Sequence, residues 1–200
     1  MNIIANNCVG ADLYFNVLKS EFKCPFIWSL TFPDEFIFLC KNYDTINFEN
    51  AELVQMTEED DKGTKKHKIQ NHIFGMRIDN KITTWYTHIL YDGTCKEPII
   101  RGDDRFYYRN FELVLTKYYE RLQRMTETPI FTVLAYQEQC WTKEKLDELE
   151  SKYPIYILTD IPDCKSSVNK HIEYVERLCH HPWHDFENKV NSWKEFVGIK

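Results

Sequence analysis

Cys8 is the residue whose type and position most clearly suggest chemistry. It follows an apolar run over residues 3–5 and two asparagines, and an amphipathic segment over 11–18 begins soon after it. This pattern predicts a strand, a polar turn and a helix whose first turn carries a thiol. The unpaired N–H groups and partial positive charge of a helix N-terminus favour a thiolate. We therefore expect Cys8 to be a nucleophile; the alternative is a small buried residue that closes the turn.

A cysteine nucleophile needs a base within hydrogen-bond distance. His88 is the preferred partner, because it follows Trp85 and Tyr86 in an expected strand and lies well downstream of the cysteine, as in papain-like enzymes. His72 is the second choice. The alternative for His88 is a half-buried strand histidine whose ring is already hydrogen-bonded.

A third group usually orients the imidazole. Asp160 ends an apolar segment and is expected to fill this role, with Asp92 and Gln137 as rivals. Asp160 could instead be a turn residue ahead of Pro162. Together, the predicted catalytic residues make the chain a cysteine-dependent hydrolase or acyl transferase.

Four further side chains are predicted to contact the substrate, which we expect to be a peptide or a glycan. These are Asn7, Trp28, Trp85 and Gln137. Aromatic rings can stack on sugars, although most of the tryptophans could equally belong to the core. The sequence has no glycine-rich phosphate loop, which argues against ordinary nucleotide-sugar chemistry.

A second group of potential ligands lies near the C-terminus. Cys179, His180 and His184 are zinc-ligand types, and the two histidines are four residues apart. Pro182 lies between them and breaks the helical register, and no second ligand pair at suitable spacing occurs elsewhere. We therefore expect no metal and no other cofactor.

Composition narrows the class of protein. The 200 residues fit one domain, and 13 Phe, 12 Tyr and 5 Trp indicate a well-packed core. A net charge of −6 without a basic stripe argues against nucleic-acid binding. We expect neither a membrane span nor a signal peptide. Seven cysteines without a Cys-x-x-Cys pair favour a reducing cytoplasm over a disulfide framework. Composition leaves the oligomeric state open.

The elements that must position these residues follow from apolar patterning. Residues 129–136 and 153–160 are expected to be strands, and 142–149 a helix capped by Thr142. This βαβ unit predicts a single α/β domain, with a mostly parallel central sheet and helices on both faces. Functional residues of such sheets gather beyond the carboxyl ends of the strands. Further helices are expected over 33–40, 106–125 and 171–197, the last interrupted at 181–182, with an exposed turn at 58–68.

Several segments resemble a group of poorly characterised bacterial and viral proteins described as papain-like cysteine peptidases, and a sister group named for exopolysaccharide biosynthesis. The segments that carry the resemblance are Ile3-Ile4-Ala5-Asn6-Asn7-Cys8-Val9-Gly10, Cys24-Pro25-Phe26-Ile27-Trp28, Thr87-His88, 118–124, 129–133 and Trp193.

The first of these groups often has a Ser-Leu-Gly type of segment ahead of the cysteine, and a Pro-Phe-Asp-Trp motif later in the chain. This chain has Asn6-Asn7 and Ile27 at those places and is therefore more similar to the second group. The resemblance implies either a papain-like Cys/His site or, as an alternative, a non-catalytic or transferase-like protein of surface-glycan biosynthesis.

Overall fold

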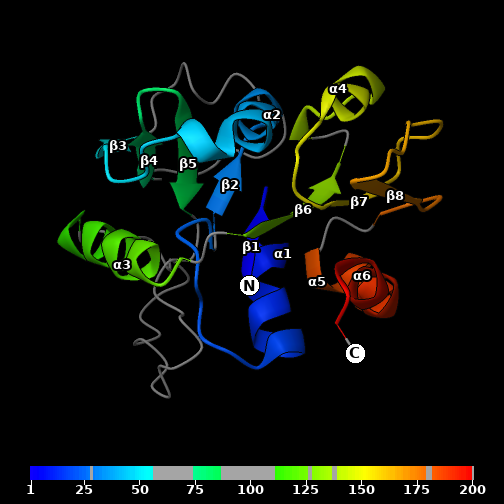
Figure 1. Cartoon of the computed structure of the whole chain (residues 1–200), viewed down its shortest axis with the longest axis horizontal. Helices are drawn as coiled ribbons and strands as arrows, with labels where there is room; N and C mark the ends of the chain where they lie inside the picture. Colours follow the sequence, from blue (N-terminus) through cyan, green and yellow to red (C-terminus); the bar gives the residue numbers. More distant parts are fainter. Residues whose placement is uncertain are drawn as a thin grey trace, which may run out of the picture.

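In the part of the chain that the structure describes, the strands form two four-stranded sheets (Figure 1). The computed structural model describes residues 1–27, 29–55, 74–86, 111–125, 128–136, 139–178 and 182–199. One sheet is parallel, with strand order β1-β6-β7-β8, and the other is antiparallel, with order β2-β5-β4-β3. The predicted α/β class and parallel sheet are thus present. The antiparallel strands form a second sheet of their own, which the prediction of a mostly parallel central sheet did not include.

The parallel sheet contains β1 (Asn2–Ala5), β6 (Pro129–Ala135), β7 (Ile155–Thr159) and β8 (Lys170–Tyr174). Every residue of β1, β6 and β7 is buried. Near-continuous apolar runs are typical of parallel strands, and they explain why these segments could be recognised in the sequence.

The predicted βαβ unit is confirmed. α4 (Lys143–Glu148) connects β6 to β7, and the Thr142 hydroxyl accepts a hydrogen bond from the Lys145 amide at 3.3 Å. At the other end of α4, the buried Lys170 ammonium donates to the carbonyls of Leu146 and Asp147 at 3.0 and 3.1 Å. Both ends of this short helix therefore have side-chain partners for their terminal backbone groups.

The antiparallel sheet contains β2 (Ser29–Thr31), β3 (Ala51–Gln55), β4 (Phe74–Ile78) and β5 (Ile82–Tyr86). It joins the parallel sheet through Thr31, whose amide donates to the Asn6 carbonyl at 2.9 Å. The predicted turn at 58–68 lies outside the described residues.

Two further helices have residues typical of helix ends. Pro33 opens α2 (Pro33–Asn42), which η2 (Tyr43–Thr45) follows, and Gly198 ends α6 in the left-handed region at φ 75°. The other helices are α1 (Val9–Asp12), its π-helical continuation η1 (Leu13–Leu18), α3 (Phe111–Gln123), α5 (Pro182–Phe186), η5 (Glu187–Lys189) and α6 (Val190–Val197).

The start of the predicted C-terminal helix is wrong. Residues 170–174 form β8, because they pair in parallel with β7 and His171 stacks on Tyr156 with ring centroids 5.2 Å apart. Among the described residues that follow β8, the next helix is α5, which starts at Pro182, within the predicted interruption.

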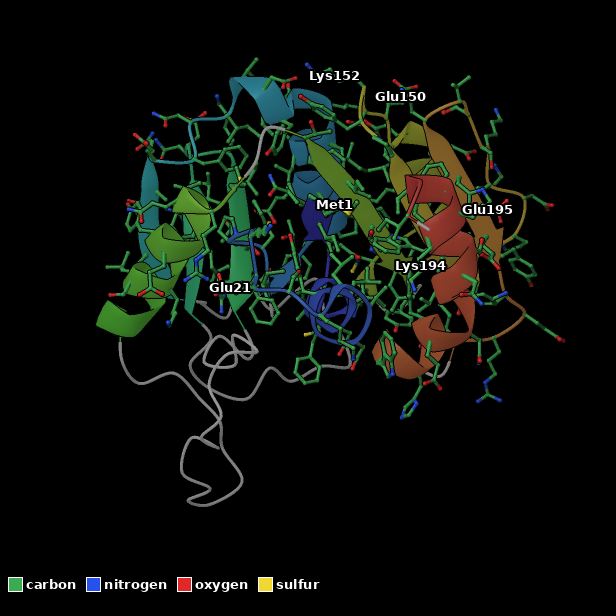
Figure 2. All side chains as sticks on the ribbon, turned by 60° about the horizontal axis from the view of Figure 1, so that its bottom comes forward. Met1, Glu21, Glu150, Lys152, Lys194 and Glu195 are labelled. Atoms are coloured by element: carbon green, nitrogen blue, oxygen red, sulfur yellow. The ribbon has the colours of Figure 1, made fainter. Side chains whose placement is uncertain are left out.

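The core continues from the parallel sheet into the C-terminal helices. Trp193 on α6 is fully buried, and its indole N–H donates to the Thr132 hydroxyl of β6 at 3.1 Å. In Figure 2, Lys194 and Glu195, next along α6, are labelled on the right, below Glu150 and Lys152 at the top. Among the described residues, no helix is long and apolar enough to cross a membrane.

Candidate functional site

The carboxyl ends of three parallel strands bring together Cys8 and Asp160, two residues that the sequence singled out, with Tyr136 between them. Cys8 follows β1 after a short turn, Tyr136 follows β6 and Asp160 follows β7. Because β6 lies between β1 and β7, the ends of those two strands are about 10 Å apart at the usual strand spacing. Cys8 and Asp160 therefore share one edge of the sheet, with Tyr136 between their strands.

Two buried asparagines hold the turn that presents Cys8. The Asn6 amide donates to the Leu134 carbonyl at 3.1 Å and accepts from the Leu134 N–H at 2.9 Å. The Asn7 amide also donates to the Leu134 carbonyl, at 3.2 Å, and accepts from the Val9 N–H at 3.2 Å. Both side chains thus fix the backbone on either side of Cys8. The predicted contact of Asn7 with substrate stays a prediction.

Cys8 differs in exposure from the core cysteines. Its side chain is half-buried, and its carbonyl accepts the amide hydrogens of Ala11 and Asp12 at 3.0 and 3.3 Å, so it begins the helical segment as predicted. Cys24 and Cys40 are buried, and burial raises the pKa of the Cys24 thiol to about 12 and that of Cys40 well above its usual value. Cys8 is therefore better placed for chemistry than either core thiol.

The segment around Ile27 lies beside α1. A Cβ atom on Gly10 would be 2.9 Å from the Ala5 Cβ and 3.7 Å from the Ile27 Cδ1. Only a residue without a side chain lets α1 approach β1 so closely. Arg121 on α3 is also buried, and its guanidinium donates to the Ile27 carbonyl at 3.5 Å.

Asp12 is a carboxyl group that the sequence analysis did not select. Its amide bonds to the Cys8 carbonyl, so the two side chains lie one helical turn apart on the same face of the helix. The side chain is half-buried, and this burial raises the pKa of the carboxyl to about 6. The spacing from Cys8 was the available signal, but the burial depends on tertiary packing.

Helix α5 packs beside α1 at this edge (Figure 1). The hydroxyl of the buried Tyr136 donates to the Asp185 carboxylate at 2.9 Å. This bond holds α5 against the carboxyl end of β6, and it therefore fixes the position of α5 beside the helix that Cys8 begins.

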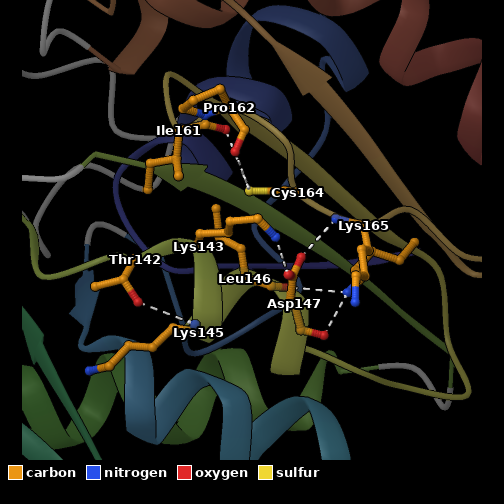
Figure 3. A network of polar contacts seen from close by, with 10 residues as sticks. Thr142, Lys143, Lys145, Leu146, Asp147, Ile161, Pro162, Cys164 and Lys165 are labelled. Carbon is orange, nitrogen blue, oxygen red and sulfur yellow. Dashed lines mark hydrogen bonds and ion pairs between the residues drawn. The ribbon is translucent and has the colours of Figure 1, made fainter.

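Asp160 is half-buried and is positioned by its neighbours. The Thr159 hydroxyl donates to the Ala135 carbonyl at 3.2 Å and accepts from the Ile161 amide at 3.0 Å. The connection that follows is held to α4, because Asp147 binds both the Lys143 ammonium and the Lys165 amide (Figure 3).

Three predicted site residues, Trp28, His88 and Gln137, lie outside the described residues, as do the alternatives His72 and Asp92 and the zinc candidates Cys179 and His180. Among the described histidines, His184 is exposed, with its Nδ1 3.5 Å from Glu187. His171 packs between Tyr156 and Phe196. Neither belongs to the Cys8 turn by these contacts.

Trp85 has a packing role in the antiparallel sheet. It is 3% exposed and faces Gly75 on β4, where an added Cβ would meet the indole at 2.7 Å. Its predicted stacking on a substrate stays a prediction.

A cavity of about 470 Å³ lies at the opposite edge of the parallel sheet, near the amino ends of β7 and β8. Its lysines already have partners: Lys41 pairs with Glu148, Lys152 with Asp44, and Lys170 with the carbonyls of α4. These contacts account for its charge without a ligand, and we do not include it in the candidate site.

Within the described ranges, no group of three or more His, Cys, Asp or Glu residues could hold a metal ion. Comparison with known proteins adds no assignment, because no family model matches the chain and no curated protein matches it.

Proposed function

We propose that the protein is a cysteine-dependent hydrolase or acyl transferase in which Cys8 is the nucleophile. The observation that carries the proposal is the position of a half-buried thiol at the carboxyl edge of a parallel sheet, in a turn held by Asn6 and Asn7. Rigid support of this kind keeps a nucleophile in one geometry. The start of a helix also favours the thiolate over the thiol.

In the proposed reaction, the Cys8 sulfur forms a bond to the carbonyl carbon of the substrate. The bond from that carbon to the leaving group then breaks, and the leaving group departs with a proton. Water or an acceptor hydroxyl or amine next attacks the thioester, and the sulfur leaves. The acyl group is thereby hydrolysed or transferred.

We propose His88 as the base that takes the thiol proton. The course of the chain supports this, because β5 ends at Tyr86, which pairs with Ser29 on β2. Thr31, at the other end of that three-residue strand, bonds to Asn6. Tyr86, two residues before His88 in the sequence, is thus two residues along β5 from Thr84, which pairs with Thr31.

Asp160 fits the role of a group that orients the base. The end of β7, which Asp160 follows, lies two strand spacings, about 10 Å, from the end of β1. This separation suits an action of Asp160 on Cys8 through an intervening imidazole. We further propose one domain in a reducing cytoplasm, with helices on both faces of the parallel sheet. The Thr31–Asn6 bond, which joins the two sheets, supports the single domain. The Trp193–Thr132 bond, which joins α6 to β6, supports the helices on the faces of the parallel sheet. The five described thiols support the reducing compartment.

The test is a peptide-resolved map of iodoacetamide alkylation at neutral pH. Cys8 should react first, and Cys164, which is also half-buried, is the matched control. A stoichiometric burst of nitrophenol from 4-nitrophenyl acetate should be lost in Cys8→Ala and kept in Cys164→Ala. His88→Ala should slow alkylation of Cys8 without unfolding the domain.

If Cys8 were among the slowest thiols and the burst survived its replacement, the enzyme proposal would be wrong. The alternative, a non-catalytic protein of surface-glycan biosynthesis, would then be favoured.

A further inference from the structure

We propose that Asp12 is a second acid–base group of the Cys8 site, which exchanges a proton with the reacting groups and sets the charge beside the thiol. This inference rests on the proposed function of Cys8. It adds a residue that neither the motif around Cys8 nor the predicted triad contains.

The geometry of the helix brings the two groups together. The Asp12 amide donates to the Cys8 carbonyl at 3.3 Å, which is the i to i+4 bond of an α-helix. Residues four apart have Cβ atoms about 5–6 Å from each other on one helix face. A substrate atom bonded to the Cys8 sulfur would therefore lie within a side chain's length of the Asp12 carboxyl.

The surroundings leave the Asp12 carboxyl without a neutralising charge in the described part of the chain. Asp12 lies on α1, which packs against η1, α5, β1 and β6. The strands β1 and β6 contain no titratable side chain.

On η1, the Tyr14 hydroxyl interacts with the Ile3 amide and the Met1 carbonyl. On α5, Asp185 accepts from Tyr136, and His184 pairs with Glu187. These contacts engage the titratable groups of the two elements, and Asp12 takes part in none of them.

Burial without compensation favours the neutral acid and raises the pKa of Asp12 to about 6. Near neutrality, such a group can be populated in both forms, which suits general acid and base catalysis. The neutral acid would give its proton to the leaving group while the S–C bond forms. The carboxylate would then take a proton from the attacking water as the S–C bond breaks.

The same carboxyl also controls the thiol. Above pH 6 it carries a negative charge one helical turn from the sulfur, which raises the pKa of Cys8 and lowers the fraction of thiolate. Below pH 6 it is neutral and this opposition is removed. The logarithm of the Cys8 alkylation rate should therefore bend near pH 6, apart from the bend caused by the thiol itself.

The test is the rate of iodoacetamide alkylation of Cys8 from about pH 4 to about pH 9 in three proteins: wild type, Asp12→Asn and the control Asp163→Asn. Asp163 is exposed, and its positive φ of 60° suits asparagine equally well. Above pH 7, Asp12→Asn should react about three- to tenfold faster than wild type, given the field of one charge at this distance and the weaker nucleophilicity of a more acidic thiol. The control should match wild type.

A carboxyl ¹³C NMR titration of wild type keeps the test open if the variant does not fold. In the folded protein, the midpoint of the Asp12 titration should lie near pH 6. In urea-unfolded protein, where the carboxyl is exposed to water, the midpoint should lie at lower pH.

The outcomes separate the two proposals. A rapidly alkylated Cys8 with the same pH profile in wild type and Asp12→Asn would overturn the role of Asp12 alone, as would an Asp12 midpoint near 4 in the folded protein. A Cys8 that reacts slowly in every variant would overturn the proposed function, and the role of Asp12 with it.

Discussion

The Asn6 side chain and the Leu134 backbone form a two-bond pair, with distances of 3.1 and 2.9 Å, one residue beyond the last residue of β1. A side-chain amide here replaces a backbone peptide unit of the parallel ladder. The β1–β6 pairing is thereby continued to the point where the chain turns toward Cys8. Asn6 thus links the sheet to the candidate nucleophile.

Replacing Asn6 by alanine should destabilise the fold. The Leu134 N–H would lose its acceptor in a buried position, while the carbonyl would keep the Asn7 amide, so we expect a loss of about 1–3 kcal/mol. Urea unfolding measures this loss, and hydrogen exchange at the Leu134 amide should be faster. Asn191→Ala, at an exposed helix position, is the control. Equal midpoints for the two variants would contradict the structural role of Asn6.

Gly10 should not tolerate a side chain. In Gly10→Ala, the new methyl group would meet the Ala5 Cβ at 2.9 Å, and overpacking of this kind costs about 1–3 kcal/mol. Because the opposing atom is itself a methyl group, the double variant Ala5→Gly/Gly10→Ala should recover part of that loss. Thermal unfolding of the four proteins gives the comparison. No recovery in the double variant would show that another contact limits this position.

The Tyr136–Asp185 bond should contribute measurably to stability. A double-mutant cycle with Tyr136→Phe and Asp185→Asn should give a coupling free energy of about 1–2 kcal/mol, because the bond involves a charged acceptor and a buried donor. The control cycle uses the exposed pair Lys41–Glu148, for which a coupling below about 0.5 kcal/mol is expected. Comparable values in the two cycles would mean that Asp185 does not anchor α5.

The parts of the fold that could be predicted are those with local signals. The β6–α4–β7 unit has buried apolar runs around a helix with its own cap at Thr142, and each signal lies within the segment it specifies. The turn ahead of Cys8 is of the same kind.

The parts that could not be predicted depend on distant partners. β2 has only three residues and pairs with β5, more than fifty positions later in the chain, so its own sequence gives little indication of a strand. β8 begins with two adjacent polar residues, Lys170 and His171, and has no regular alternation, so its pairing with β7 and the stacking of His171 on Tyr156 decide its structure.

The candidate site divides in the same way. The position of Cys8 followed from a local pattern, whereas Asp12 acquires its character from burial. The Tyr136–Asp185 bond joins residues nearly fifty positions apart. The chemistry of Asp12 and Asp185 therefore becomes visible only when the sheet edge and α5 are seen together.

The burial of Asp12 should also lower stability at neutral pH. The pKa of its carboxyl rises from 3.8 to about 6 on folding, so the folded state binds more protons than the unfolded state between these values. Stability is then complete below about pH 4 and falls as pH rises through 6. A difference of one in pKa corresponds to about 1.4 kcal/mol. With a reduction for the partial exposure of Asp12, the free energy of unfolding falls by about 1–3 kcal/mol.

Asp12→Asn removes this loss, because asparagine stays neutral at every pH. The variant should be more stable than wild type by about 1–3 kcal/mol at pH 7.5, and the difference should disappear near pH 4. Urea midpoints at the two pH values test this, with Asp163→Asn expected to match wild type at both. A variant that is no more stable than wild type at pH 7.5 would show that the Asp12 carboxylate is compensated in the folded protein. A gain in stability together with altered Cys8 reactivity is the result expected of a residue kept for function at the expense of stability.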